Sequence, residues 1–315
     1  MAMRSNRQIV KAAGSTITTA GLAAGGALNP EQARRFIQQT FDATPLGPLV
    51  RHEMRVAKTG EIDKIGIARR ILRKKVENTD DGYRAGVTHG KIEYATTAVR
   101  VPWEITEETL RENIEGQNYE EVVTNLMTNQ IGCDAEDIYI NGDTAVSVDD
   151  PDHDFLYVND GWLKQIKNGG HVVDVASKNS GAMSLDLFYD GLRAVPNKYN
   201  NGRLRWLMSP HRRQEWERYI LNQAVTVGGI ITDRRVENPA SIPAVEVPSM
   251  PDDAIILTDP QNLVVVNSYG VVIRKTTEGK DAIMQDKRFY VVHFDFDTII
   301  EELDATAVIT GLAAI

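Results

Sequence analysis

The chain has 315 residues, of which 42% are hydrophobic and 25% are charged, and its single cysteine is Cys133. This composition is that of an ordinary globular protein, and one cysteine excludes an internal disulfide framework and any multi-cysteine zinc or iron–sulfur site. No run approaches ~18 uninterrupted apolar residues, which excludes a membrane-spanning helix. The formal net charge of −9 argues against tight binding of duplex nucleic acid, which needs a basic surface.

The charges are arranged in blocks of opposite sign. Residues 51–75 carry nine lysines and arginines against three carboxylates, whereas residues 104–121 carry seven glutamates against Arg111 alone. Blocks of this kind are most often solvated faces of a folded domain.

The first 30 residues contain no carboxylate. Their serines, threonines and glycines make them too polar for the apolar region of a signal peptide, so we expect an arm that becomes ordered by contact. Asn29 and Pro30 then predict the start of a helix that runs to about Thr40, because Asn is a preferred cap and Pro suits the first helical position.

From Leu49 to Ile105 the pattern predicts long strands that fold back on each other around the polar turn 77–82. This hairpin carries too few apolar residues to form a core alone, and an isolated hairpin is marginally stable in water. We therefore expect it to find its burial on its own body or on a neighbouring subunit.

Two helices are predicted next, a short one over 106–109 and a long one from about Asn118 to Asn141. Asn118 is a plausible N-cap for the long helix. Its apolar stripe is formed by Tyr119, Val122, Val123, Leu126 and Cys133, with Met127, Ile131 and Ile138 beside it. This reading predicts that Cys133 is a buried structural thiol.

Residues 143–182 are predicted to be rich in loops, and helix and strand signals alternate after them. Helices are expected over 184–196 and 210–221, and strands over 204–208, 254–257, 263–267, 271–275, 289–296 and 306–310. In the strand over 289–296, Tyr290, Val292, Phe294 and Phe296 are predicted to share one buried face. The class is α+β, with helices and strands segregated rather than in a repeating βαβ order.

No motif nominates an enzyme. The segment 86–91 has the wrong spacing for a phosphate-binding loop, and the six histidines never stand four residues apart as a helical zinc site requires. Asp150, Asp152 and Asp154 imitate the start of a calcium loop, but Phe155 stands where glycine is needed. We therefore predict no catalytic activity, no cofactor and no metal site.

The order of the elements resembles that of the major capsid protein of tailed bacteriophages, the Hong Kong 97 type. The resemblance covers most of the chain and rests on the order of four segments: 103–110 (WEITEETL), 136–143 (EDIYINGD), 205–210 (RWLMSP), and 257–260 (LTDP) continued by 269–274 (YGVVIR).

The resemblance implies an α+β Hong Kong 97-type fold with four parts. These are an N-terminal arm (1–50), an extended β-hairpin loop (51–103), a peripheral domain with a long spine helix (104–158 and 288–315), and an axial domain (159–287). It also implies a non-enzymatic function: self-assembly into hexamers and pentamers of an icosahedral shell that encloses double-stranded DNA. The localisation implied is the virion, assembled in the cytoplasm of a host bacterium.

The implied partners are other copies of the chain, a portal, a separate scaffolding protein and, in some shells, a decoration protein, without sequence-specific DNA binding or a membrane. A separate scaffold is expected because few residues precede the first helix. Family members that weld subunits join a hairpin lysine to a late asparagine. Lys64, Lys74 and Lys75 are candidate lysines, but no asparagine follows Asn267, so we expect no covalent cross-links.

The resemblance also gives the charge blocks a function. It implies that the basic hairpin of one subunit contacts the acidic region of the next subunit. The candidate contact residues are Arg69, Arg70, Arg73, Lys74 and Lys75 on one side and Glu107, Glu108, Glu112 and Glu115 on the other. Two alternatives stay open: an encapsulin-like nanocompartment shell protein, which shares the fold, and a soluble α+β enzyme with an unrecognised site.

Overall fold

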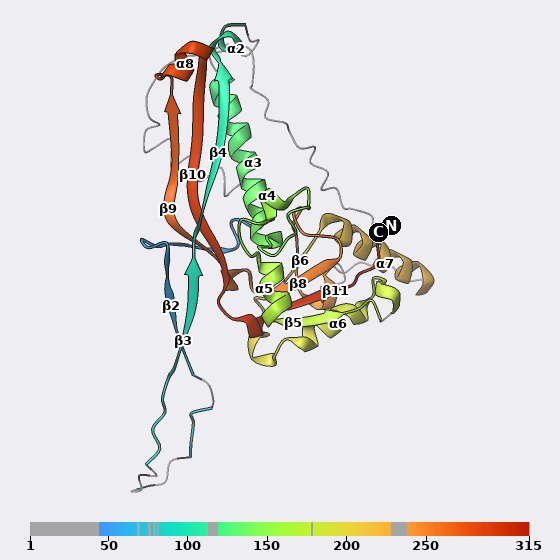
Figure 1. Ribbon diagram of the computed structural model, residues 1–315. Helices are drawn as coiled ribbons and strands as arrows, with labels where there is room; N and C mark the ends of the chain where they lie inside the picture. Colours follow the sequence, from blue (N-terminus) through green and yellow to red (C-terminus); the bar gives the residue numbers. More distant parts are fainter. Residues whose placement is uncertain are drawn as a thin grey trace.

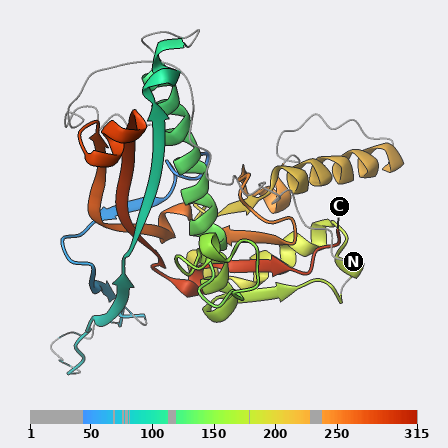
Figure 2. The ribbon, with the colours of Figure 1, turned by 45° about the horizontal axis from the view of Figure 1, so that its top comes forward.

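The computed structural model describes residues 44–67, 70–74, 77, 80, 82–112, 119–177, 179–227 and 238–314 (Figure 1). Side chains are not described at 111, 112, 179 and 223–227. The helix expected over 29–40 and most of the expected arm lie outside these ranges. The described residues form two sheet-based bodies and a hairpin that projects away from both (Figures 1 and 2).

The first sheet has four strands, in the order β1 (Arg51–Met54), β9 (Leu263–Thr276), β10 (Lys287–Ile300) and β4 (Thr97–Thr106). β1 runs parallel to β9, and the other neighbours are antiparallel. The predicted face of β10 is confirmed, because Tyr290, Val292, Phe294 and Phe296 are all buried. Trp103 of β4 stacks on Tyr290, with ring centroids 5.3 Å apart. The two strands expected over 263–275 are one continuous strand, β9.

The long helix α3 (Tyr119–Asn141) lies along the buried face of this sheet (Figures 1 and 2). Tyr139 meets Phe296 edge-to-face at 5.0 Å. The helix exists as predicted and Val123, Ile131 and Ile138 are buried, but the predicted stripe is wrong at Leu126 and Cys133. Cys133 is exposed, and the residues that face the protein are Val123, Thr128, Ile131, Gly132, Ala135, Glu136, Ile138 and Ile140.

The error in α3 has a physical cause. Apolar residues occur around most of the helix, so their spacing alone does not select one stripe. Packing on the sheet buries Ile131, Ala135 and Ile138. At 3.6 residues per turn, Cys133 lies about 160° around the helix from Ile131. Leu126, also predicted on the buried stripe, is 63% exposed.

The second sheet has five strands, in the order β5 (His171–Asp174), β11 (Ala307–Thr310), β8 (Ala254–Thr258), β6 (Arg205–Met208) and β7 (Ala244–Glu246). It packs with α5 (Trp162–Gly169), α6 (Leu185–Ala194) and α7 (Pro210–Val227). Phe188 of α6 meets Trp206 and Trp216 edge-to-face at 5.0 and 4.9 Å. These aromatic contacts join the helices α6 and α7 to the interior strand β6 in one core.

The segment 143–182 is not the loop region that the sequence predicts. It contains α4 (His153–Leu156), α5 and β5. In α5 the buried residues Trp162, Leu163 and Ile166 cover only two turns, which is too short for a clear periodic signal. The remaining described elements are the hairpin strands β2 (Thr59–Gly66) and β3 (Thr88–Ala95), the helices α2 (Glu107–Glu112) and α8 (Lys280–Gln285), and single 3₁₀ turns at 179–181, 197–199, 239–241, 260–262 and 303–305.

The sheets do not follow the expected domain boundaries strand by strand. β9, within the range expected for the axial domain, pairs with β10 in the first sheet, whereas β11, near the chain end, lies in the second sheet. The chain thus crosses between the two bodies more often than a simple division into consecutive segments implies. None of the described helices has the length and apolarity needed to cross a bilayer.

Candidate functional site

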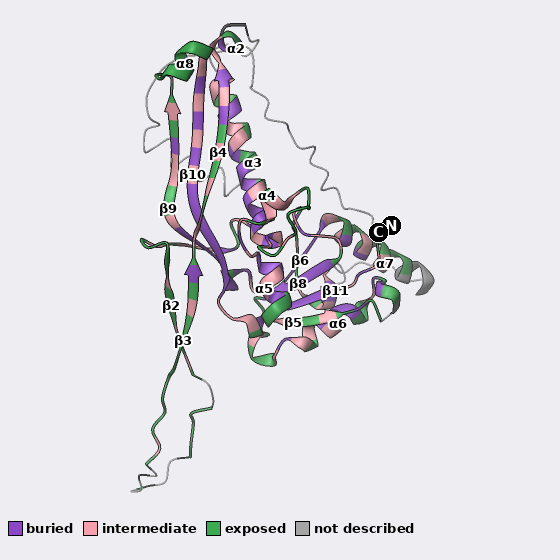
Figure 3. Cartoon of the chain, viewed as in Figure 1, coloured by how far each residue is buried: buried purple, intermediate pink, exposed green. Residues whose placement is uncertain are grey.

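The projecting hairpin is the most unusual surface of the described chain. β2 (Thr59–Gly66) pairs antiparallel with β3 (Thr88–Ala95), and the described residues between them carry the excursion further out (Figure 1). Large apolar side chains on it face solvent (Figure 3), among them Ile65, Ile67, Val87 and Leu72, which is 95% exposed. Contiguous exposed apolar side chains of this kind mark interaction sites.

The inner face of the hairpin root packs on its own body. Tyr94 is buried in a small cluster with Val264, Val266 and Ile299. Gly60 pairs with Tyr94 across the hairpin, and a Cβ at this position would lie 2.7 Å from the tyrosine hydroxyl. Glycine is therefore required where the ring crosses the neighbouring strand.

Buried carboxylates of β10 hold the hairpin root through a hydrogen bond and an ion pair. Ala95 donates its backbone N–H to Asp297 Oδ2 at 2.7 Å, and Lys58 forms an ion pair with Asp295 at 2.9 Å. Asp297 also accepts from Asn159 Nδ2 at 3.1 Å. Burial raises the pKa of Asp297 above its ordinary value, because the charged form loses its hydration.

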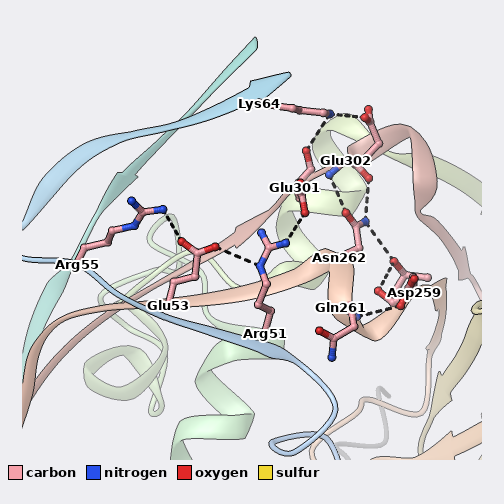
Figure 4. Close-up of polar contacts among 10 residues, drawn as sticks. Arg51, Glu53, Arg55, Lys64, Asp259, Gln261, Asn262, Glu301 and Glu302 are labelled. Atoms are coloured by element: carbon pink, nitrogen blue, oxygen red, sulfur yellow. Dashed lines mark hydrogen bonds and ion pairs between the residues drawn. The ribbon is translucent and has the colours of Figure 1, made fainter. Parts of the chain in front are cut away.

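A polar network joins β1, the hairpin and the chain that follows β10 (Figure 4). Arg51 bridges Glu53 at 3.3 Å and Glu301 at 2.6 Å. Lys64 of β2 donates to the Glu301 carbonyl at 3.2 Å and pairs with the Glu302 carboxylate. The root of the hairpin is thus held in one orientation, while its outer part has no such support among the described residues.

The structure places only some of the predicted contact residues. Arg69, Lys75 and Glu115 lie outside the described residues, and the side chain of Glu112 at the end of α2 is not described. Arg70, Arg73 and Lys74 are exposed beyond the end of β2. The Arg73 guanidinium lies 3.6 Å from the ring centroid of Tyr83, on the returning side of the hairpin.

Three glutamates of the acidic block pair with basic residues of their own chain. Glu107 binds the Arg288 guanidinium through both oxygens, with Nη2 to Oε2 at 3.1 Å. Glu120 pairs with Lys275 at 2.5 Å, and Glu104 pairs with Lys287 at 2.8 Å. Of the four predicted acidic contact residues, only Glu107 and Glu108 have described side chains, and of these two Glu108 is exposed.

These internal partners were not predicted. Lys275, Lys287 and Arg288 stand more than 150 residues after the glutamates that they bind, so no local spacing joins them. The pairing of β10 with β4, which sets Lys287 opposite Thr106, brings the two groups together. A block of like charge in the sequence is therefore a mixed surface in the fold.

A cavity of about 20 Å³ lies between the segment 44–50 and α3, lined by Leu46, His52, Glu136 and Trp162 among others, and it has room for about one water molecule. Leu46 donates its N–H to Glu136 at 3.1 Å. Within the described ranges, no three metal-ligating side chains gather. The surfaces, rather than an interior site, carry the functional signal.

Comparison with known proteins agrees with this emphasis on surfaces. No protein-family model matches the chain. A putative prophage capsid protein of Bacillus subtilis (strain 168), YqbE, is 27% identical over 324 aligned positions, which span 96% of this chain and 97% of the relative.

Solved structures give the same result at the level of the fold. A chain of the satellite phage P4 procapsid matches with a TM-score of 0.64 at 16% identity, over 89% of this chain and 99% of that one. The capsid of an empty GTA particle matches with a TM-score of 0.61 at 12% identity, over 94% of each chain. An encapsulin from Synechococcus elongatus PCC 7942 matches with a TM-score of 0.51 at 12% identity, over 93% of this chain and 92% of that one. The chain has the Hong Kong 97-type fold of phage capsid proteins, in the α+β form that its sequence predicts.

Proposed function

We propose that this chain is the major capsid protein of a tailed phage, many copies of which close into an icosahedral shell around double-stranded DNA. The observation that carries the proposal is the projecting hairpin, whose outer apolar side chains are left exposed by the single chain. A monomer gains no stability from apolar side chains that stay exposed to solvent, whereas a shell subunit can bury them on a neighbour. The capsid fold and the prophage capsid relative support the same function.

In this proposal the four parts have distinct functions in a shell. Residues 1–50 form the N-terminal arm, residues 51–103 the extended loop, residues 104–158 with 288–315 the peripheral domain, and residues 159–287 the axial domain. The subunits associate as hexamers and pentamers of one closed shell. The proposed partners are a portal and a separate scaffolding protein, with a decoration protein in some shells, and the particle assembles in the host cytoplasm.

The shell wall needs no specific contact with DNA. The chain carries a net charge of −9, so at short range the wall repels packaged DNA rather than binding it. The function is structural, and we propose no catalytic step.

The opposite charge blocks then act between subunits. We propose that Arg70, Arg73 and Lys74, with Arg69 and Lys75, meet the acidic end of the next subunit near α2. Because Glu107 already binds Arg288, this contact falls mainly on Glu108, Glu112 and Glu115. Exposed pairs contribute only ~0–1 kcal/mol each, so they set register more than affinity.

Negative-stain electron microscopy of the purified chain tests the proposed function. Closed shells, tubes or ring-shaped capsomers support it, and a small discrete oligomer without such assemblies contradicts it and favours a soluble enzyme. Mass spectrometry of particles from the native host separates the two shell functions. A portal with protected DNA supports a phage capsid, whereas an enclosed enzyme cargo without a portal indicates an encapsulin.

A further inference from the structure

Asparagine followed by glycine occurs three times in the chain, at 141–142, 168–169 and 201–202. In this dipeptide the backbone nitrogen of the second residue readily attacks the asparagine side chain, because glycine has no Cβ to hinder the approach. The attack needs a peptide nitrogen that no other hydrogen bond holds, and an amide side chain that can turn toward it. The three pairs differ in both respects.

The pair at the end of α3 is held on both sides. The N–H of Gly142 donates to the Ile138 carbonyl at 2.9 Å, so this nitrogen is already engaged. The Asn141 side-chain amide donates to Asp137 Oδ1 at 2.5 Å and to the Ser249 carbonyl at 2.6 Å. Both of its N–H groups therefore have an acceptor, and rotation of the side chain toward Gly142 costs two hydrogen bonds.

The second pair is held by helix geometry. Asn168 and Gly169 are the last two residues of α5, and a helical backbone directs each N–H along the axis toward the carbonyl of the preceding turn. The next residue, Gly170, continues this pattern, since its N–H donates to the Ile166 carbonyl at 2.8 Å. The nitrogen of Gly169 therefore becomes available only when the end of the helix opens.

The third pair lies in an exposed turn between the 3₁₀ turn 197–199 and β6. Asn201, Gly202 and Arg203 are all exposed. Among the residues that the structure describes, none accepts a hydrogen bond from the N–H of Gly202. Gly202 has a left-handed φ of 85°, and beyond its chain neighbours no atom lies within 4 Å of where a Cβ would stand. Both the nitrogen and the space around it are accessible.

The same turn prepares the Asn201 side chain for attack. The N–H of Arg203 donates to Asn201 Oδ1 at 3.1 Å, which is the contact of an Asx turn and folds the side chain back over its own backbone. This donor also stabilises the negative charge that develops on Oδ1 during the attack. The Arg205 guanidinium donates to the Gly202 carbonyl at 3.4 Å, and its positive charge favours loss of the nearby amide proton.

We propose that Asn201 is a site of spontaneous covalent modification in the folded chain. The Gly202 nitrogen forms a bond to Asn201 Cγ, the Cγ–Nδ2 bond breaks, and Nδ2 leaves as ammonia with the proton of the Gly202 nitrogen. Water then opens the cyclic imide at either carbonyl, which yields aspartate or isoaspartate and adds one negative charge. This inference goes beyond the proposed function and does not depend on it, because the reaction needs only the turn and water.

The fold can accept either product. Isoaspartate lengthens the main chain of the turn by one carbon, and the turn is exposed. The strand that follows is fixed independently, because the backbone N–H of Trp206 donates to the Pro243 carbonyl and its indole N–H to the Pro239 carbonyl, each at 3.0 Å. We therefore expect the modified chain to stay folded and to accumulate with age.

Peptide mapping of the wild-type chain tests the proposal with two internal controls. The native chain is kept at mildly alkaline pH, sampled over time and digested at mildly acidic pH, and tandem mass spectrometry measures conversion at each asparagine. Conversion at Asn201 should be about ten-fold or more faster than at Asn141 and Asn168, which react only after local opening. In guanidinium chloride the three rates should become similar. Native conversion that is absent at Asn201, or equal at the three sites, would overturn the proposal.

One variant separates attack by the Gly202 nitrogen from simple exposure. Gly202→Asn keeps the turn, because Asn tolerates the left-handed conformation and space for its Cβ is open. Its side chain hinders the attack, so conversion at Asn201 should fall about ten-fold while the midpoint of thermal unfolding stays unchanged. Asn200, equally exposed but not followed by glycine, is the control in the same peptide and should keep its amide. Conversion at Asn201 that is as fast in the variant as in the wild type would overturn this route.

Discussion

Asp297 is a carboxylate that the fold buries among neutral hydrogen-bond donors. It accepts from the backbone N–H of Ala95 and Thr298 and from the side chain of Asn159. Burial, together with the nearby negative charge of Asp160, raises the pKa of Asp297. A raised native pKa means that the protonated form stabilises the fold. That contribution is complete below the unfolded pKa of about 3.8 and is lost as the pH rises through the native value.

Replacing Asp297 by Asn should therefore change both the stability and its pH dependence. The amide places a donor where Asp297 Oδ2 accepts from Ala95, so we expect a loss of about 1–3 kcal/mol. The wild-type free energy of unfolding should also rise relative to the variant as the pH falls from 7 toward 4. Urea unfolding at several pH values measures both effects. Asp63→Asn, an exposed carboxylate of β2, is the control, and parallel pH curves for wild type and Asp297→Asn would contradict the argument.

Cys133 gives a second prediction at this scale. Because the thiol is exposed, Ellman's reagent should label it completely in unassembled subunits without denaturant. Partial desolvation and the charges of Glu136 and Asp134 raise its pKa, so the labelling rate should increase steeply above pH 8. A thiol that reacts only after unfolding would contradict the exposed placement. Protection that appears only in shells would place this side of α3 in a subunit contact.

The same residue shows the limit of reading single positions from a sequence. Cys133 lies in a helix that was correctly predicted, and its apolar neighbours pointed to burial. The side that faces the protein depends on the sheet that α3 meets, and most of that sheet is built from strands more than 120 residues further on. By contrast, the buried face of β10 was predicted correctly, because a strand with strict alternation has only two faces to choose from.

Among the elements, the hairpin depends most on assembly. Reversing Arg70, Arg73 and Lys74 to Glu should leave the subunit folded, since these residues are exposed and the hairpin core lies at its root. Shell formation should fail or become strongly dependent on salt, which circular dichroism and electron microscopy together can establish.

Rescue of that variant identifies the partner charges. Glu108→Lys with Glu112→Lys should restore part of the shell yield, because true pairs show coupling beyond the sum of single changes. Glu107 is left unchanged, as its loss would strand the buried Arg288, which is only 4% exposed. Shells that form normally from the reversed hairpin at low salt would show that the basic block is only a solvated face.

At this scale the sequence predicted the hairpin, four of the helices (α2, α3, α6 and α7) and the short strands β6, β8 and β11, but neither their mutual contacts nor every short element. The strands β5 and β7 have four and three residues, and α5 has only eight, so each gives little periodic signal. The neutral character of the acidic block was also hidden, because Glu107 and Arg288 meet only when β10 has paired with β4. Local pattern gives the elements, and long-range strand pairing determines which charges remain free.

For the whole molecule, the prediction is a shell held together without covalent links between subunits. Lys64, a candidate amine, is held by Glu302 and the Glu301 carbonyl of its own chain, and no asparagine follows Asn267. Shells that are boiled and reduced should run on a denaturing gel as one band near 35.0 kDa. A ladder that survives reduction and boiling would show that another pair of side chains forms the cross-link.

The strand β10 has a mechanical consequence for such a shell. Its register with β9 shifts on either side of Asp295, so the long ribbon of the first sheet is least stiff there and bends most easily at that point under load. The hairpin is fastened at the same place, through Lys58 to Asp295 and through Ala95 to Asp297. Bending of the sheet at these bulges therefore changes the orientation of the hairpin, because the hairpin is attached at the same residues. In the proposed shell, pressure that deforms one subunit would therefore reach its neighbour as a displacement of the hairpin tip.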